Sequence, residues 1–402
     1  VLQYSNTPSL VTCEISEVFM VRPSKPTVDD IMVIEAFRLG IVPYNATEAW
    51  TQGRSGEVSA IREWLNDLGQ GTLIIEGPYG SGKSHLLHHL YATAIRSQYA
   101  VSLTDLDSSE ATAAFPKRIY RRIVKNLKAP IGGEQVGFRG LMRAIAENAD
   151  GNPVADHPYF GALIDELRKK GELREDTWAW IEGREAVKGK YGSLWDYTTV
   201  ANVYCHMLSC IGWLMVKVLD LDGFLILFDE VETAKSVYYQ YQFVRGLNFF
   251  RGLSMVANDE PVLLEEKVVK NLTRKGEETG LVYSGHFPIP YLYRIPSYLK
   301  VVFAITPAVL TGEFRRWRST VPLLELDSLG IDDLRSLFDM FVKHYEKVYG
   351  VRIDPTDRRQ YFAILLERGG FTSTRIFIKS MVELMDFLRL YPHSNIEAIL
   401  GE

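Results

Sequence analysis

Residues 73–95 read LIIEGPYGSGKSHLLHHLYATAI: an apolar run, a glycine-rich stretch and a helix-patterned segment in succession. The apolar residues 73–75 predict a buried strand, and the helical spacing of the apolar residues after Ser84 predicts a helix. Glycines between them free the backbone, so that successive N–H groups can point inward and form an anion-binding nest. The positive end of the helix dipole faces the same anion. The order of strand, loop and helix therefore predicts a phosphate-binding loop.

Two side chains at the end of this loop suit the phosphates of ATP. Lys83 can reach the β- and γ-phosphates as a point charge, and the Ser84 hydroxyl can ligate Mg²⁺, so the expected cofactors are ATP and Mg²⁺. The alternative is a plain glycine turn before a helix, which the flanking strand and helix disfavour. The residues expected to contact the nucleotide here are Gly77, Pro78, Tyr79, Gly80, Ser81, Gly82, Lys83, Ser84 and His85.

Composition indicates an ordinary globular protein with two or three folding units in 402 residues. No apolar run approaches the roughly 20 residues that span a bilayer, so no membrane segment is expected. The chain has three cysteines, Cys13, Cys205 and Cys210. This small, odd number does not suit a disulfide framework and favours a reducing cytoplasm. Cys205, His206 and Cys210 could suggest a metal site, but their apolar helical surroundings favour a buried core. The net charge of −5 means that any nucleic-acid contact would need a local basic patch.

A second chemical landmark is the sequence FLILF at residues 224–228, followed by Asp229 and Glu230. Five consecutive apolar residues suit a strand that is buried on both faces of a parallel sheet. Ligands bind at the carboxyl ends of such strands, where the acidic pair lies. Asp229 is placed to hold the Mg²⁺ shell, and Glu230 is placed to polarise the attacking water. Glu232 is a weaker accessory candidate, and an ordinary surface pair is the alternative reading of the two acids.

The rest of the chain divides around these landmarks. We expect an N-terminal extension and base-binding segment at 1–52, and a P-loop α/β core at 53–326 with a mainly helical insertion at about 130–195. Residues 327–402 should form a C-terminal helical lid. The predicted fold class is thus α/β, a P-loop NTPase of the AAA+ (ASCE) type with a parallel sheet. Further expected elements are a helix at 116–128 with a basic face that is either solvated or contacts phosphates, a helix from Leu194 to Leu219, a charged loop at 267–278, and a last strand at 321–326.

Several remaining segments resemble AAA+ proteins. Gly53 and Arg54 resemble the element that packs against the adenine base in the origin-recognition branch, although an ordinary capped helix reads similarly. The strand ending at Thr306 resembles the sensor-1 strand, whose last residue helps to place the lytic water. The arginines before the last strand resemble the position of a trans-acting arginine finger, with Arg315 and Arg316 favoured over Arg318 and a solvated basic helix end as the alternative. Arg375 resembles the sensor-2 arginine, with a longer spacing from the preceding glycines than the usual Gly-x-x-Arg.

Together these segments resemble one family, the smaller ATP-binding P-loop proteins of BREX-type phage-resistance islands. The resemblance extends over roughly residues 31–385, and the residues that carry it are Ala36-Phe-Arg38-x-Gly40-x-Val-Pro43, Gly53-Arg54, Tyr79 to His85, Ile119-Tyr-Arg, Phe228 to Glu232, Gly246-Leu-Asn248-Phe249-x-Arg251-Gly252 and Phe303-Ala-Ile-Thr306-Pro. It implies a homo-oligomeric AAA+-like ATPase that acts with other phage-defence proteins, and with DNA as a candidate client.

Three functions are therefore compared. The favoured one is a Mg²⁺-dependent ATPase that acts as a motor or switch in an assembly on DNA or DNA-bound partners. The second is a nucleotide-gated scaffold with little or no hydrolysis, against which the poised carboxylate of Glu230 argues. A small-molecule kinase is the third, and the all-helical C-terminal region argues against it.

Overall fold

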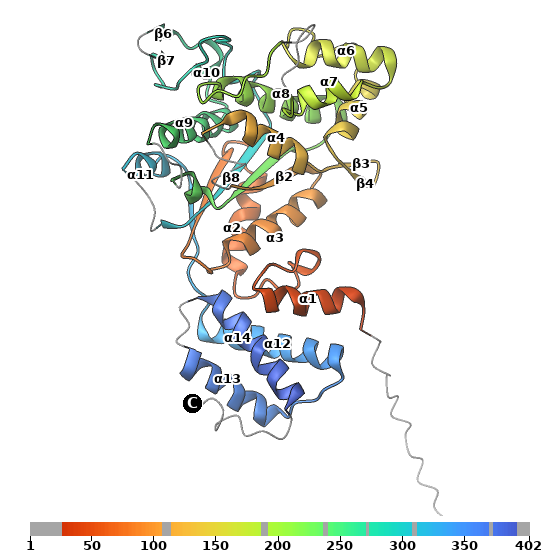
Figure 1. The fold of residues 1–402 in the computed structure, drawn as a ribbon, viewed down its shortest axis with the longest axis vertical. Coiled ribbons are helices and arrows are strands. Elements are labelled where there is room, and N and C mark those ends of the chain that lie inside the picture. Colours follow the sequence, from red (N-terminus) through yellow and green to blue (C-terminus); the bar gives the residue numbers. More distant parts are fainter. Residues whose placement is uncertain are drawn as a thin grey trace, which may run out of the picture.

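The computed structural model describes residues 26–106, 114–185, 192–235, 240–270, 273–307, 312–369 and 373–391. Cys13 and the end of the glycine-rich segment before Arg375 lie outside the described residues. The upper part of the molecule is an α/β unit and the lower part is a group of helices (Figure 1).

A five-stranded parallel sheet forms the centre of the upper part. Its order is β2-β5-β8-β1-β9, with all paired strands parallel. The bounds are β1 Thr72–Glu76, β2 Tyr99–Asp105, β5 Gly223–Asp229, β8 Leu299–Ile305 and β9 Leu323–Glu325. Every residue of β1, β5 and β8 is buried, as expected for central strands covered on both faces. The predicted α/β fold class with a parallel sheet and C-terminal helices is confirmed.

Alternate residues of the strands belong to different hydrophobic clusters. Ile74, Ile226 and Phe303 share a cluster with α8 Ala201–Leu219, α9 Gln240–Ala257 and α4 Pro116–Asn126. Ile75, Leu227 and Val302 share another with α2 Ser55–Asn66 and α3 Lys83–Arg96. Successive side chains of a strand point to opposite faces, so each face of the sheet has its own helical layer.

The sheet order brings three chemical landmarks to one edge. β8 pairs with β1 on one side and with β5 on the other, and Glu76 at the end of β1 lies opposite Ile305 at the end of β8. Because parallel strands end on the same edge, the residues that follow β1, β5 and β8 converge there.

The predicted insertion is mainly helical and begins with a short hairpin. Its elements are β3 Ala129–Ile131, β4 Glu134–Val136, α5 Phe138–Asn148, α6 Phe160–Lys170 and α7 Glu175–Ile181. They share the cluster that covers the α8 face of the sheet. The helix predicted from Leu194 begins only at Ala201, and residues 192–200 hold irregular backbone with a turn at 198–199 instead.

The α8 helix is long and apolar enough to cross a membrane by length and composition, but 72% of its apolar window is buried inside the protein. Cys205 and Cys210 are free thiols in its buried face, and burial raises the pKa of both. The core reading of these cysteines is confirmed.

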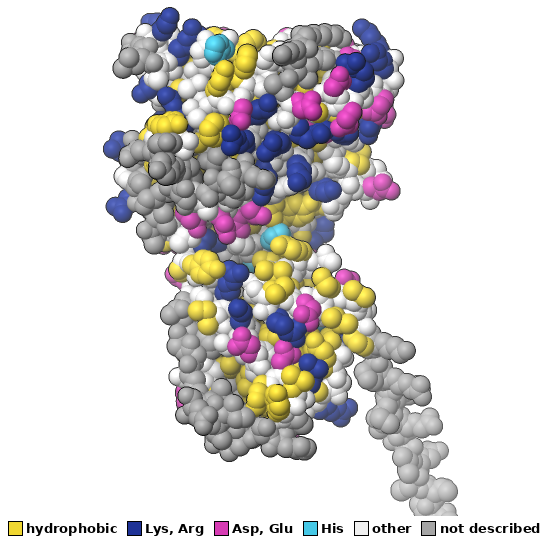
Figure 2. All heavy atoms as spheres, in the orientation of Figure 1, with side chains coloured by type: hydrophobic (Ala, Val, Ile, Leu, Met, Phe, Trp, Pro, Cys, Tyr) yellow, Lys and Arg dark blue, Asp and Glu magenta, His cyan; other side chains and the backbone are white. Residues whose placement is uncertain are grey.

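The basic face of α4 is only partly free. The Lys117 ammonium is buried and donates to the carbonyl of Leu194 at 3.0 Å, and Arg118 pairs with Asp196 at 3.2 Å. Figure 2 shows basic side chains across the middle of the upper part, over the region of α4. Lys117 and Arg118 therefore hold the chain segment that leads into α8.

The C-terminal region consists of α12 Ile331–Tyr349, α13 Pro355–Gly369 and α14 Thr374–Leu390. The α1 helix Val28–Leu39 packs with them in a separate hydrophobic cluster, and Arg38 donates two hydrogen bonds of 3.0 Å to Asp386. A segment near the start of the chain thus completes the core of the C-terminal helices (Figure 1). The division of the chain at residues 52 and 326 stays a prediction.

Two predicted boundaries need correction. The charged segment at 267–278 is not a plain loop, because β6 Val268–Lys270 and β7 Arg274–Gly276 pair in an antiparallel hairpin. The last strand is shorter than predicted and covers β9 alone. The remaining short elements are η1 Tyr44–Ala46, η2 Val231–Lys235, α10 Val262–Glu265 and α11 Gly312–Arg318.

Candidate nucleotide site

The predicted phosphate loop runs from the end of β1 to the first residue of α3. Gly80 and Gly82 have φ values of +77° and +104°, a region that residues with a side chain rarely adopt. A Cβ atom on Gly80 would also lie 2.7 Å from the Ser373 side chain. The loop therefore needs glycine at both positions, and its curled backbone opens at the N-terminus of α3.

Lys83 is buried and turned back onto the loop. Its Nζ donates to the carbonyls of Gly77 at 2.8 Å and Pro78 at 3.1 Å. Burial lowers the pKa of this ammonium, and the carboxylates of Glu232 and Asp229 oppose that effect. A phosphate anion at the nest would replace weak carbonyl partners by a charged one.

Ser84 and Asp229 supply the oxygen donors that suit Mg²⁺. The Ser84 hydroxyl bonds the Asp229 carboxylate, and burial raises the pKa of that carboxyl while the Ser84 bond opposes the rise. A nearby cation stabilises the ionised form of a buried carboxyl group whose pKa is raised. Mg²⁺ is usually held by one or two carboxylates together with substrate phosphates, so this hard-oxygen pair fits the ion.

Glu230 lies at the exposed side of the same acidic group. Its backbone N–H donates to Asp229 at 2.9 Å, and its φ of +54° turns the chain sharply after the strand. Burial raises the pKa of the Glu230 carboxyl, and the neighbouring charges of Asp229 and Glu232 raise it further. A carboxyl whose pKa is moved upward is better suited to accept a proton than one at its usual value.

Thr306 is positioned by Glu232. The Thr306 N–H donates to one Glu232 carboxylate oxygen at 3.2 Å, and the Thr306 hydroxyl donates to the other. Thr306 follows β8, whereas Glu232 belongs to η2 after β5, so the contact joins the ends of two neighbouring strands. Glu232 thus holds the candidate sensor residue in place.

Arg54 is occupied by protein groups. It is buried, pairs with Glu57 at 2.6 Å, and donates to the carbonyls of Ser81 at 2.9 Å and Asp327. The guanidinium therefore ties α2 and the start of the C-terminal region to the phosphate loop. It lines the pocket, with its donors directed at the protein.

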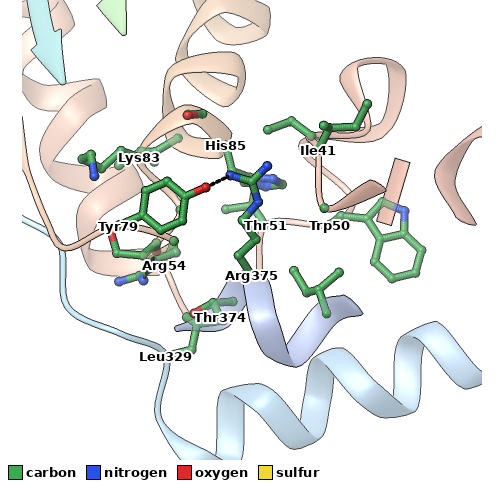
Figure 3. A pocket seen from close by; sticks show the side chains of 18 of the residues that line it. Ile41, Trp50, Thr51, Arg54, Tyr79, Lys83, His85, Leu329, Thr374 and Arg375 are labelled. Carbon is green, nitrogen blue, oxygen red and sulfur yellow. Dashed lines mark hydrogen bonds between the residues drawn. The ribbon is translucent and has the colours of Figure 1, made fainter. Parts of the chain in front are cut away.

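Arg375 comes from α14 and reaches the phosphate loop despite its stretched spacing. Its Nη1 donates to the Tyr79 hydroxyl at 2.6 Å, and its guanidinium lies 5.4 Å from the Tyr79 ring centre. Its backbone N–H donates to the Gly80 carbonyl at 3.3 Å. Figure 3 shows the two side chains meeting across the pocket, with Lys83 and His85 nearby. The C-terminal helices and the phosphate loop are thus in direct contact.

The pocket continues from the loop into an apolar recess. The recess is formed by α1, the chain after it and the C-terminal helices, and its apolar lining comprises Phe37, Ile41, Val42, Pro43, Trp50, Leu329, Leu337 and Ile378. Such a recess next to a phosphate nest suits the planar base of a nucleotide.

A hydroxyl in this recess fixes the orientation of two histidines. Thr51 donates its only hydroxyl proton to the Thr47 carbonyl at 2.8 Å, and it lies 2.9 Å from His85 Nε2 and 3.1 Å from His89 Nδ1. Because a hydroxyl has one proton, both ring nitrogens must donate to it. Burial lowers the pKa of the His85 imidazole to about 4, so the ring is neutral at pH 7.

The His85 pKa predicts acid sensitivity. Between about pH 6.5 and pH 4 the unfolded chain binds a proton on His85 that the folded chain does not, so the free energy of unfolding falls with falling pH. The contribution is at most about 3 kcal/mol. Urea denaturation at several pH values should show a shallower pH dependence for His85→Gln than for the parent chain. Identical pH dependences would contradict this prediction.

The three arginines of α11 differ in their surroundings. Arg315 and Arg316 are exposed, and neither makes an ion pair with any residue in the described ranges. Arg318 instead binds Glu76, the last residue of β1, with one N–O distance of 2.7 Å. Arg318 therefore forms an ion pair within its own chain, whereas Arg315 and Arg316 are available to a neighbouring molecule.

The structure adds residues that the motifs did not indicate. Thr51 and the partnership of Glu232 with Thr306 both depend on contacts between distant segments, so no local pattern marks them. The position of Ser373 could be anticipated weakly from the sequence, because serine before a helix is a typical N-cap. In the structure its side chain accepts a hydrogen bond from the Ile376 N–H.

Comparison with known proteins agrees with the sequence resemblance. Residues 26–143 match the family model described as BREX system ATP-binding protein BrxC/D, which confirms the resemblance to BREX ATP-binding proteins over that part of the chain. No curated protein matches the chain. Among solved structures, AMPPCP-bound DnaA from Aquifex aeolicus is similar at 12% identity and a TM-score of 0.37. That match covers 86% of this chain and 65% of the DnaA chain.

Proposed function

We propose that this ATP-binding chain is a Mg²⁺-dependent ATPase of the AAA+ type. The observation that carries the proposal is the convergence of Lys83, Ser84, Asp229 and Glu230 at the edge of the sheet. A binding module has no need of a carboxylate with a raised pKa beside a Mg²⁺ site.

Each residue then has a role. Lys83 and the loop N–H groups bind the phosphates, and Ser84 and Asp229 hold Mg²⁺, which neutralises phosphate charge. Glu230 accepts the proton of the attacking water, and Thr306, held by Glu232, helps to place that water. Arg375 leaves Tyr79 for the γ-phosphate, because a phosphate oxygen is a stronger partner than a phenol.

The second candidate is a nucleotide-gated scaffold. The contact of Arg375 with Tyr79 favours it, since any change at the loop would be passed to the C-terminal helices with or without hydrolysis. The comparison of ATP turnover with ATP binding separates the two functions.

The cellular location, the partners and the assembly of this protein are also proposals. Membership of a BREX system would place the chain in the cytoplasm, with other phage-defence proteins as partners and DNA as the client of the assembly. Exposed Arg315 and Arg316 suit a homo-oligomer in which one subunit contacts the nucleotide of the next.

The first test concerns Lys83. We expect Lys83→Ala to lower the affinity for ATP by roughly 10- to 100-fold, the scale of a hydrogen bond between charged groups. Titration with a fluorescent ATP analogue measures it, and exposed Lys169→Ala on α6 is the matched control. Unchanged affinity in Lys83→Ala would remove the nucleotide site as assigned.

A further inference from the structure

A second cleft lies apart from the nucleotide site. It has a volume of about 840 Å³ and is lined by α9, the β6–β7 hairpin and α11 together with the residues after it. Figure 1 shows α9 between the hairpin and α11 on one side of the upper part.

The lining of this cleft is strongly basic. Arg245 and Arg251 of α9, Lys275 of the hairpin and Arg316 of α11 all line it, and among the described residues of its lining Glu260 is the only one with a carboxylate. A cleft lined by one sign of charge focuses the electrostatic field and attracts counter-ions of the opposite sign.

These cations have no carboxylate partner among the described residues. Within the part of the chain that the structure describes, Arg245, Lys275 and Arg316 make no ion pair, and Arg251 donates only to the Thr279 carbonyl at 3.0 Å. Arg245 is half-buried, and burial lowers the pKa of its guanidinium. A half-buried arginine without an anion carries a desolvation cost that a bound anion would offset.

We propose that this cleft binds the phosphate backbone of single-stranded nucleic acid. Several cations along one cleft match a chain of regularly spaced phosphates better than one isolated anion. The side chains of Asn258 and Thr273 add polar groups to the lining of the same cleft. The recessed shape favours a single strand over a duplex, whose phosphates lie on a convex surface.

The cleft is mechanically close to the nucleotide site. The Trp317 ring of α11 lies 4.9 Å from Phe303 of β8, the strand that leads to Thr306, and α9 packs on η2, which carries Glu232. Binding of a nucleic-acid strand in the cleft would thus act on the residues that position the attacking water. The binding itself does not depend on hydrolysis, so the inference extends the proposed function.

The test uses the full chain without nucleotide, so that a failure here and a failure of ATP hydrolysis are separate results. Fluorescence anisotropy with a labelled single-stranded oligonucleotide of mixed sequence, and with its duplex, measures affinity at about 50 and 200 mM salt. We expect the double variant Arg245→Gln/Lys275→Gln to bind the single strand about 10-fold or more weakly. The slope of log K against log[salt] should become shallower by about 1.4, which is about 0.7 for each of the two phosphate contacts removed.

Lys169→Gln, which removes an exposed charge on α6, should leave binding within about twofold of the parent chain. ATP turnover without nucleic acid should be unchanged in the double variant. Equal affinities and salt slopes of the parent and the double variant would overturn the proposal. Tighter binding of the duplex, or binding of an acidic peptide with no binding of either nucleic acid, would overturn it as well.

Discussion

Replacing Arg315 by alanine is expected to lower ATP turnover by ~10³-fold, if this exposed arginine completes the active site of a neighbouring subunit. Arg316→Ala is the second candidate, although Arg316 also lines the basic cleft. The physical reason is electrostatic: a guanidinium supplied from outside stabilises the charge that develops on the transferred phosphate. Hydrolysis then needs two subunits, so specific activity should rise with protein concentration.

Mixing experiments distinguish a trans-acting arginine from a local effect. Subunits with Glu230→Gln are expected to hydrolyse ATP poorly but keep their arginines, so they should restore turnover to an inactive arginine variant. Steady-state ATPase measured across a dilution series for the parent, each variant and the mixtures gives the result.

Arg318→Ala is the matched control. Its guanidinium binds Glu76 in its own chain, so its removal should lower stability and should not be rescued by mixing. Concentration-independent activity that survives both Arg315→Ala and Arg316→Ala would show a chain that hydrolyses ATP alone. The proposed assembly would then be wrong.

Glu230→Gln is expected to slow hydrolysis by at least ~100-fold, the scale of removing a general base. ATP binding should stay close to that of the parent, because the proposed phosphate contacts come from Lys83 and the loop N–H groups and not from Glu230. The amide keeps the size of the side chain but cannot take a proton from water.

Single-turnover kinetics with a saturating excess of protein separate the chemical step from binding. Glu232→Gln is the comparison variant, since Glu232 contacts Thr306 and should act only through its position. If Glu230→Gln retains full turnover while Glu232→Gln loses it, Glu232 is the base and the assignment is reversed.

Several features of this protein could be predicted from the sequence by itself. The phosphate loop, the acidic pair after a buried strand and the C-terminal helices are contiguous patterns, because backbone conformation and burial depend on neighbouring residues. Glycine at positions 80 and 82 follows from the left-handed backbone that the loop requires. The nucleotide and the fold class were therefore predictable.

Other features were decided only by the tertiary structure, because they join segments whose separation in sequence says nothing about their distance in space. The position of β8 between β1 and β5 brings Thr306 to Glu232. The tertiary structure also pairs Arg318 with Glu76, whereas Arg315 is exposed. The contact of Arg375 with Tyr79 depends on how the C-terminal helices dock. No pattern along the chain encodes these distances, since loops of variable length connect the strands and the sheet order sets which of their ends meet.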